Sequence, residues 1–268
     1  VEARDVLIVE LQAALLGAAG GLVALVRLQD AFLLLLPYGT LAVSVLRAWQ
    51  TGQQGQAWAW LRAASVAAGC TLLVFLPQVI VWQRIYGTWL ALPYLSDHDP
   101  AFTWLCPHIA GVLVSPFRGL FTWHPVYLLA TIGLAVLATC DQRMALVLLL
   151  LLALDVYIVA SWWAWWQGDA FGGRMFLNAM WIWVLGLAGL LHCLREHLRP
   201  VLYRPLLVVA LLLVVWNGLA LAQYRLGFVP MDAPLTWEQL TIDRLRLPWL
   251  LLQRGMLHEG VSGGDFLY

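Results

Sequence analysis

The sequence predicts an all-α fold, a polytopic bundle of transmembrane helices, and two observations carry this prediction. Of 268 residues, 62% are hydrophobic and only 11% are charged, whereas a soluble domain carries roughly 25% charged residues. The sixteen tryptophans cluster where hydrophobic runs end, which is typical of the aromatic belts at membrane interfaces. The formal net charge is zero, so no basic face indicates a nucleic-acid partner. Membrane lipids are the expected surroundings.

A helix that crosses the hydrocarbon core takes about 20 apolar residues, and this length predicts about seven spans. They cover Leu7–Val26, Ala31–Leu46, Ala63–Val81, Val126–Cys140, Met144–Ser161, Met175–Leu194 and Pro205–Leu221. We therefore expect a transmembrane helical bundle over residues 1–222 and an extracytoplasmic or interfacial tail over residues 223–268.

Arginines in the short connections predict the orientation of the bundle. Connections rich in arginine favour the cytoplasmic side, and three connections qualify: those with Arg47 and Arg62, with Arg143, and with Arg195, Arg199 and Arg204. The outer side then receives Arg27–Asp30, the long loop Tyr86–Thr122, the short connection Trp162–Arg174 and the tail. Within the tail, Leu235–Arg254 alternates apolar and charged residues, so it either lies flat at the outer interface or packs on the outer loops.

The long outer loop contains His108 and the run Asp97–His98–Asp99. Carboxylates and imidazole are ready ligands for a divalent cation. The alternative for the run is a solvated turn before Pro100. No cofactor is expected beyond this possible metal ion.

The second outer cluster follows four tryptophans and ends in Gly168–Arg174. Arg174 is expected to open the sixth spanning helix, where exposed amides and the helix dipole favour an anion. The forked donors of arginine suit a phosphate. The alternative is an arginine that anchors the helix end among lipid headgroups.

Three further charged residues are candidates. Arg27 and Asp30 lie between the first two spans, at the same outer level. Asp155 lies within the fifth span, where a carboxylate costs several kcal/mol unless it is paired or hydrated. It is either functional or a structural partner for an arginine or for a tryptophan N–H.

Three stretches resemble bacterial polytopic glycosyltransferases of the GT-C class, which include protein mannosyltransferases and lipid A aminoarabinose transferases. They are Gly21–Asp30, Ser115–Phe121 followed by Pro125, and Gly168–Phe176. The resemblance implies a multi-pass enzyme of the bacterial inner (cytoplasmic) membrane whose active face is extracytoplasmic. It would transfer a sugar from a polyprenyl-phosphate donor to an extracytoplasmic acceptor of the cell envelope, with inversion at the sugar carbon.

The same resemblance implies that Arg27, Arg118 and Arg174 hold the lipid phosphate. In that family the catalytic carboxylate lies in an early outer loop, which the resemblance implies would precede the residues of this chain. The chain is therefore expected to be a C-terminal portion that is inactive alone. Among the carboxylates on the outer side, Asp169, near Arg174 in sequence, is the best placed to act as the catalytic base.

A flippase or transporter for a polyprenyl-linked glycan, without catalytic activity, is the alternative function. A flippase should carry charged residues deep in several spans, whereas Asp155 is the main deep charge of this sequence.

Overall fold

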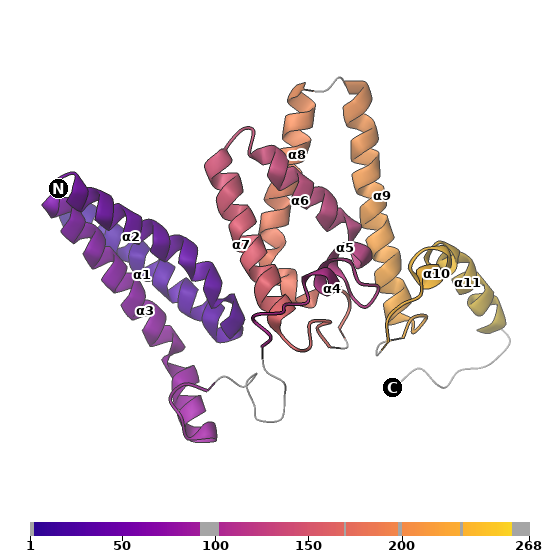
Figure 1. The fold of residues 1–268 in the computed structure, drawn as a ribbon, viewed down its shortest axis with the longest axis horizontal. Coiled ribbons are helices and arrows are strands. Elements are labelled where there is room, and N and C mark those ends of the chain that lie inside the picture. The colour runs from indigo at the N-terminus through magenta and orange to yellow at the C-terminus, as the bar shows by residue number, and fades with distance from the viewer. Residues whose placement is uncertain (1–2, 92–101, 169, 198–199, 231–232, 259–268) are drawn as a thin grey trace. The chain divides into compact units, whose positions relative to one another are not determined.

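The computed structural model describes residues 3–91, 102–168, 170–197, 200–230 and 233–258 (Figure 1). Regular structure within these residues is helical, apart from an isolated bridge between Phe102 and Trp162. Contacts divide the chain into two compact units, Val1–Asp99 and Pro100–Tyr268. The predicted all-α helical bundle is confirmed.

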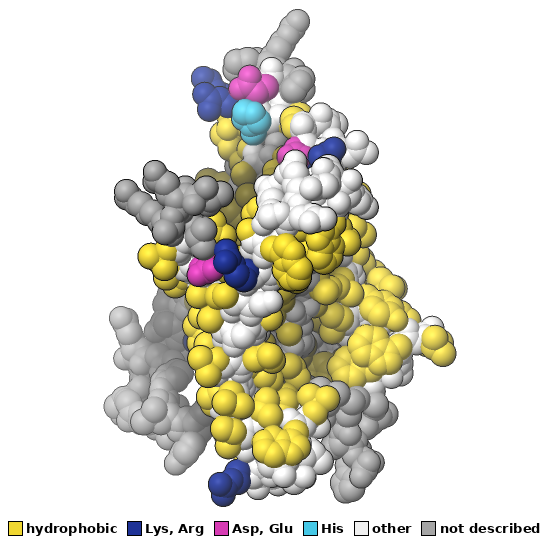
Figure 2. All heavy atoms as spheres, turned by 90° about the vertical axis from the view of Figure 1, so that its left-hand side faces the viewer, with side chains coloured by type: hydrophobic (Ala, Val, Ile, Leu, Met, Phe, Trp, Pro, Cys, Tyr) yellow, Lys and Arg dark blue, Asp and Glu magenta, His cyan; other side chains and the backbone are white. Residues whose placement is uncertain are grey.

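The first unit contains three long helices. They are α1 (Ala3–Val26), α2 (Leu35–Gln50) and α3 (Gln54–Tyr86), and a short 3-10 helix, η1 (Leu28–Leu34), joins α1 to α2. α3 packs along both α1 and α2 (Figure 1). Hydrophobic side chains dominate the face drawn in Figure 2, with charged groups few and scattered.

Small residues bring α1 and α3 into close contact. A Cβ atom built on Gly17 would lie 2.1 Å from the carbonyl oxygen of Ala67, so only glycine fits there. Close backbone approach of this kind is common between membrane helices, where lipid tails leave packing rather than apolar burial to drive association. The Thr71 hydroxyl lies 2.9 Å from the carbonyl oxygen of Gly17 and 2.6 Å from the Tyr38 hydroxyl. Thr71 therefore joins all three long helices.

The second unit contains the remaining helices. In chain order they are α4 (Ile109–Val114), α5 (Leu120–Trp123), α6 (Pro125–Leu137), α7 (Gln142–Ser161), η3 (Arg174–Ala179), α8 (Met180–His197), α9 (Pro200–Arg225), α10 (Trp237–Leu240) and α11 (Ile242–His258). α6 packs mainly on α8, α7 contacts α4 and α6, and α9 contacts α8, α6 and α11.

Six helical segments of the described chain are long and apolar enough to cross a membrane. They are Leu7–Val26, Leu28–Gln50, Gln54–Tyr86, Gln142–Ser161, Arg174–Glu196 and Tyr203–Arg225. The predicted fourth span, Val126–Cys140, differs: α6 has 13 residues, or roughly 20 Å of helix, which is short of a core about 30 Å thick. The architecture is that of a multi-pass membrane protein.

The third spanning helix is longer than predicted. α3 begins at Gln54, so Arg62 lies about two turns inside the helix rather than in the preceding connection. α3 also continues to Tyr86, and the loop after it contains the short helices α4 and α5. Apolar content alone marks the hydrophobic core of a helix, whereas the polar ends of α3 extend past it.

Replacement of Gly133 by alanine should destabilise the α6–α8 contact. A Cβ atom at Gly133 would lie 2.0 Å from the carbonyl oxygen of Gly186, and overpacking of this kind costs about 1–3 kcal/mol. The matched control is Gly218→Ala in α9, where a Cβ atom meets nothing within 4 Å and helix propensity favours alanine by about 0.5–1 kcal/mol. Thermal unfolding in detergent should separate the two variants; equal midpoints would contradict the packing.

Candidate functional site

Arg118 lies in a tight turn between α4 and α5. Its φ of 64° is left-handed, which is uncommon for a residue with a side chain. The Ser115 side chain holds the turn, because its Oγ accepts from the Phe117 amide at 3.0 Å. A Cβ atom on Gly119 would lie 2.4 Å from the Ser115 carbonyl oxygen, so glycine is required beside Arg118. The Arg118 side chain is only 2% exposed.

A second turn, at Gln167 and Gly168, follows α7. Both residues have left-handed φ values, 69° and 68°. The Gln167 side chain is completely buried, and its Oε1 accepts from the Met175 amide at 2.8 Å. The Nε2 atom of Gln167 has no hydrogen-bond partner in the described part of the chain. Gln167 thus fastens this turn to η3.

The two turns meet at Gly168. Nη1 of Arg118 donates a hydrogen bond to the Gly168 carbonyl oxygen. A Cβ atom built on Gly168 would lie 3.4 Å from Nη2 of Arg174, so the second guanidinium also lies against this glycine. We call Arg118, Gln167, Gly168 and Arg174 the Gly168 cluster. Arg118 is buried and Arg174 is exposed, so Arg174 is the cation of the cluster that a ligand can reach.

Aromatic rings surround the Arg118 turn. The Phe117 ring stacks on Trp166 with centroids 5.9 Å apart and meets Trp165 edge-on at 6.4 Å. Cζ of Arg118 lies 5.0 Å from the Phe117 ring centroid, within the range of a cation–π contact. His108, a predicted candidate, is exposed and stacks on Trp165 at 5.7 Å. The tryptophan run therefore packs against the arginine turn as well as marking the helix end.

The sixth spanning segment begins at Arg174 as predicted, but its first six residues form a 3-10 helix. Arg174–Ala179 forms the 3-10 helix η3, and the α-helix begins at Met180. Two glycines precede Arg174, and the Phe176 amide bonds the Gly173 carbonyl oxygen at 3.0 Å, a tight turn of the kind common at helix ends. The Arg174 side chain adds its own positive charge at the start of this continuous helical segment.

Asp155 anchors η3 from within the bundle. It is completely buried on α7, and the Asn178 side-chain amide lies 3.4 Å from its Oδ1. A buried carboxylate is stabilised by such donors. Of the two interpretations made from the sequence, this contact fits a structural partner one turn from Arg174.

His124 lies between α5 and α6 and is nearly completely buried. Its Nδ1 forms a hydrogen bond with the Asn217 side chain on α9. Gly172 presses against the other side of the ring, where a Cβ atom would come 1.9 Å from Nε2. Burial lowers the pKa of His124, the Asn217 hydrogen bond raises it, and the positive charge of Arg244 lowers it further. The net effect is a pKa below 6.5, so the ring is neutral at physiological pH.

Arg244 docks α11 onto α9. Its Nε donates to Oε1 of Gln223 at 2.9 Å, and its Cζ lies 5.0 Å from the Trp216 ring centroid. The side chain is 1% exposed, and burial lowers its pKa to about 10, which keeps it charged at neutral pH. The segment before α10 also contacts the Arg118 turn, because the Leu235 amide donates a hydrogen bond to the Pro116 carbonyl oxygen at 3.5 Å. The tail thus packs on α9 and on the Arg118 turn.

Two other predicted candidates belong to the first unit. Arg27 is partly buried between α1 and η1. Its carbonyl oxygen accepts a hydrogen bond from the backbone amide of the buried Asp30 at 2.9 Å. The structure therefore brings together two of the three predicted phosphate ligands, Arg118 and Arg174, within one unit. The predicted candidates Asp97, His98, Asp99 and Asp169 lie outside the described residues. Within the described ranges, no three His, Cys, Asp or Glu side chains gather as a metal site would need.

Sequence reasoning missed Gln167, His124 and Arg244. A glutamine beside four tryptophans carries a weak signal, since a polar residue at the end of an apolar run must be hydrated or hydrogen-bonded. Arg244 carries none, because its neighbours Asp243 and Arg246 make it look like one charge on a solvated face. Only contact with α9 distinguishes it.

Comparisons of the chain with protein-family models, with curated proteins and with solved structures find no match. The glycosyltransferase family and its activity therefore stay predictions.

The neutral state of His124 predicts a stability that falls on acidification. Since the folded pKa is depressed below 6.5, unfolding takes up a proton once the pH drops below that value. The loss amounts to at most about 1.4 kcal/mol per pH unit until the folded pKa is reached. His124→Asn should flatten the dependence of the unfolding midpoint between pH 7.5 and 5.5, whereas His108→Asn, at an exposed position, should keep it. Parallel curves for wild type and His124→Asn would contradict this.

Proposed function

We propose that the chain forms part of a membrane glycosyltransferase of the GT-C type, in which the Gly168 cluster holds the phosphate of a polyprenyl-linked sugar donor. One observation carries the proposal: two arginines from separate turns meet at a single glycine, at the end of apolar helices. Cationic residues are costly in such surroundings. Two of them converging on one backbone position suit an anionic ligand.

The two arginines are assigned different tasks. Arg174 is exposed, so its forked donors can contact phosphate oxygens directly. Arg118 is buried and bonded to the Gly168 carbonyl oxygen, so it positions the turn and adds a second positive charge nearby. Coulombic attraction in these partly apolar surroundings exceeds that in water. The prenyl tail would lie along the exposed apolar helices.

The chemistry that this arrangement supports is displacement at the anomeric carbon. An acceptor oxygen attacks that carbon, the bond from carbon to the phosphate oxygen breaks, and the electron pair leaves with the phosphate. Arg174 stabilises the negative charge that grows on the leaving group, a common large contribution to catalysis. The acceptor proton must pass to a base, and no residue of the described chain is assigned to that role. The chain thus contributes the leaving-group side of the reaction.

A flippase is the alternative function, and the distribution of charge favours a site on one face. Arg118, His124, Arg174 and Arg244 lie near the same end of α6, η3 and α9. A path across the bilayer would need charged groups at several depths. Asp155, the deep charge of α7, is hydrogen-bonded to Asn178.

Binding of undecaprenyl phosphate to the purified chain in detergent tests the proposal. Arg174→Gln should weaken binding by about tenfold, which corresponds to roughly 1.4 kcal/mol, because it removes the accessible cation. The matched control is Arg225→Gln, an exposed arginine in the last turn of α9, which should bind as the wild type does. Equal binding by all three proteins, or absence of binding, would exclude the phosphate site.

A further inference from the structure

A groove runs between α2 and α3 in the first unit. It has a volume of about 510 Å³, and its lining is largely apolar. Two facing stripes at helical spacing form its walls: Tyr38, Ala42, Val45 and Leu46 on α2, and Leu61, Ala64, Ser65 and Ala68 on α3. The alanines and the serine are too short to fill the space between the helices. Tyr38 lies at one end of the groove, and its hydroxyl bonds the Thr71 hydroxyl at 2.6 Å.

The other end of the groove continues into a second, more polar hollow. This hollow has a volume of about 330 Å³ and shares Leu61 and Ser65 with the groove. Its remaining lining includes Arg62 and Trp58. Trp58 is 62% exposed, as expected for a tryptophan at a membrane interface. The Ser65 hydroxyl donates to the Leu61 carbonyl oxygen at 2.9 Å, so it is satisfied without a ligand and presents little polarity to the groove.

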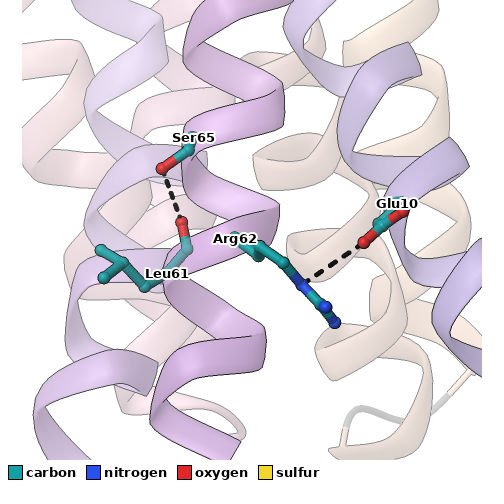
Figure 3. A network of polar contacts seen from close by, with 4 residues as sticks. All are labelled: Glu10, Leu61, Arg62 and Ser65. Carbon is teal, nitrogen blue, oxygen red and sulfur yellow. Dashed lines mark hydrogen bonds and ion pairs between the residues drawn. The ribbon is translucent and has the colours of Figure 1, made fainter.

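Arg62 supplies the charge of the hollow. Its Nε lies 3.4 Å from Oε1 of Glu10 on α1, and the two side chains are 59% and 36% exposed. Figure 3 shows that the contact with Glu10 is made through Nε, and the terminal end of the Arg62 guanidinium extends beyond that atom. An exposed pair of this kind is weak, worth roughly 0–1 kcal/mol. Arg62 can therefore accept an anion on its outer nitrogens while Glu10 holds the Nε side.

We propose that this composite groove binds an anionic phospholipid, with its phosphate on Arg62 and one acyl chain between α2 and α3. The site combines an apolar groove about two helical turns long, a guanidinium beside it, and an exposed tryptophan. Lipid tails are as apolar as the groove walls, so the channel contributes shape and packing. Selectivity for an anionic headgroup comes from Arg62.

The groove shares no residue with the Gly168 cluster, because its lining belongs to the first unit and the cluster to the second. Glu10 lies about two turns after the start of α1 and Arg27 directly follows its end; the two are separated by 17 residues of sequence, or roughly 25 Å of helix. A bilayer core is about 30 Å thick, so the groove opens toward the membrane face opposite Arg27. Arg47 and Arg62 predict that this face is cytoplasmic, where anionic lipids attract basic residues.

Native mass spectrometry of the full chain in detergent tests the proposal, with phosphatidylglycerol and phosphatidylcholine as the two probes. The wild type should bind phosphatidylglycerol more tightly, and Arg62→Gln should remove that preference, with a loss of about threefold to tenfold. Arg84→Gln, at an exposed arginine near the other end of α3, is the control and should retain it. Glu10→Gln should strengthen binding, because Arg62 is then free of its partner.

Filling the groove provides a second test. Ser65 is exposed and lines both hollows, so Ser65→Leu should fill the groove and weaken the binding of both lipids. Thr40 is exposed on α2 outside the groove, so the control Thr40→Leu should leave lipid binding unchanged. Equal affinity of the wild type for the two lipids, or unchanged lipid preference in Arg62→Gln, would overturn the proposal. Binding of undecaprenyl phosphate should be unaffected by Arg62→Gln, so the two proposals fail separately.

Discussion

The hydrogen bond from Arg118 to the Gly168 carbonyl oxygen is the constraint on which the second unit's candidate site depends. It joins the turn before α5 to the turn after α7, two segments about 50 residues apart in the chain. Neither turn is regular structure, and each contains a residue with positive φ that is not glycine. Such conformations persist only when their surroundings over-determine them. Here the surroundings are a buried guanidinium, a buried glutamine and a wall of tryptophans.

The same principle recurs at the other polar anchors of this unit. Asp155 bonds Asn178, His124 bonds Asn217, and Arg244 bonds Gln223. In each of these pairs a titratable side chain bonds a neutral side-chain amide. An amide orients the charged or ring group and avoids the full desolvation cost of a buried ion pair. These contacts hold η3, α6 and α11 in register with the helices beside them.

The two proposed anion sites use arginine in opposite ways. In the Gly168 cluster one arginine is buried to shape a backbone turn while another stays exposed to the ligand. In the groove of the first unit, Arg62 stays exposed and a weak pair with Glu10 holds it at the groove mouth. The fixed backbone turns of the Gly168 cluster would favour accurate positioning of a reacting phosphate. The exposed guanidinium of Arg62 would suffice for contact with a lipid headgroup.

Composition and hydrophobic run length by themselves determined the fold class, because a chain this apolar can satisfy its backbone in a bilayer only as helices or a closed barrel. They also located the six long spans of the described residues, whereas the predicted fourth span is the 13-residue helix α6, too short to cross the hydrocarbon core alone. The sequence pointed to Arg174 through its place after the glycine-rich turn, whereas Arg118 was reached through the resemblance to GT-C glycosyltransferases. Their convergence on Gly168, the burial of Arg118 and the docking of Arg244 on Gln223 were decided by tertiary structure alone. The physical reason is that burial and hydrogen bonding of a side chain depend on which distant segment packs against it, and local sequence carries no record of that partner.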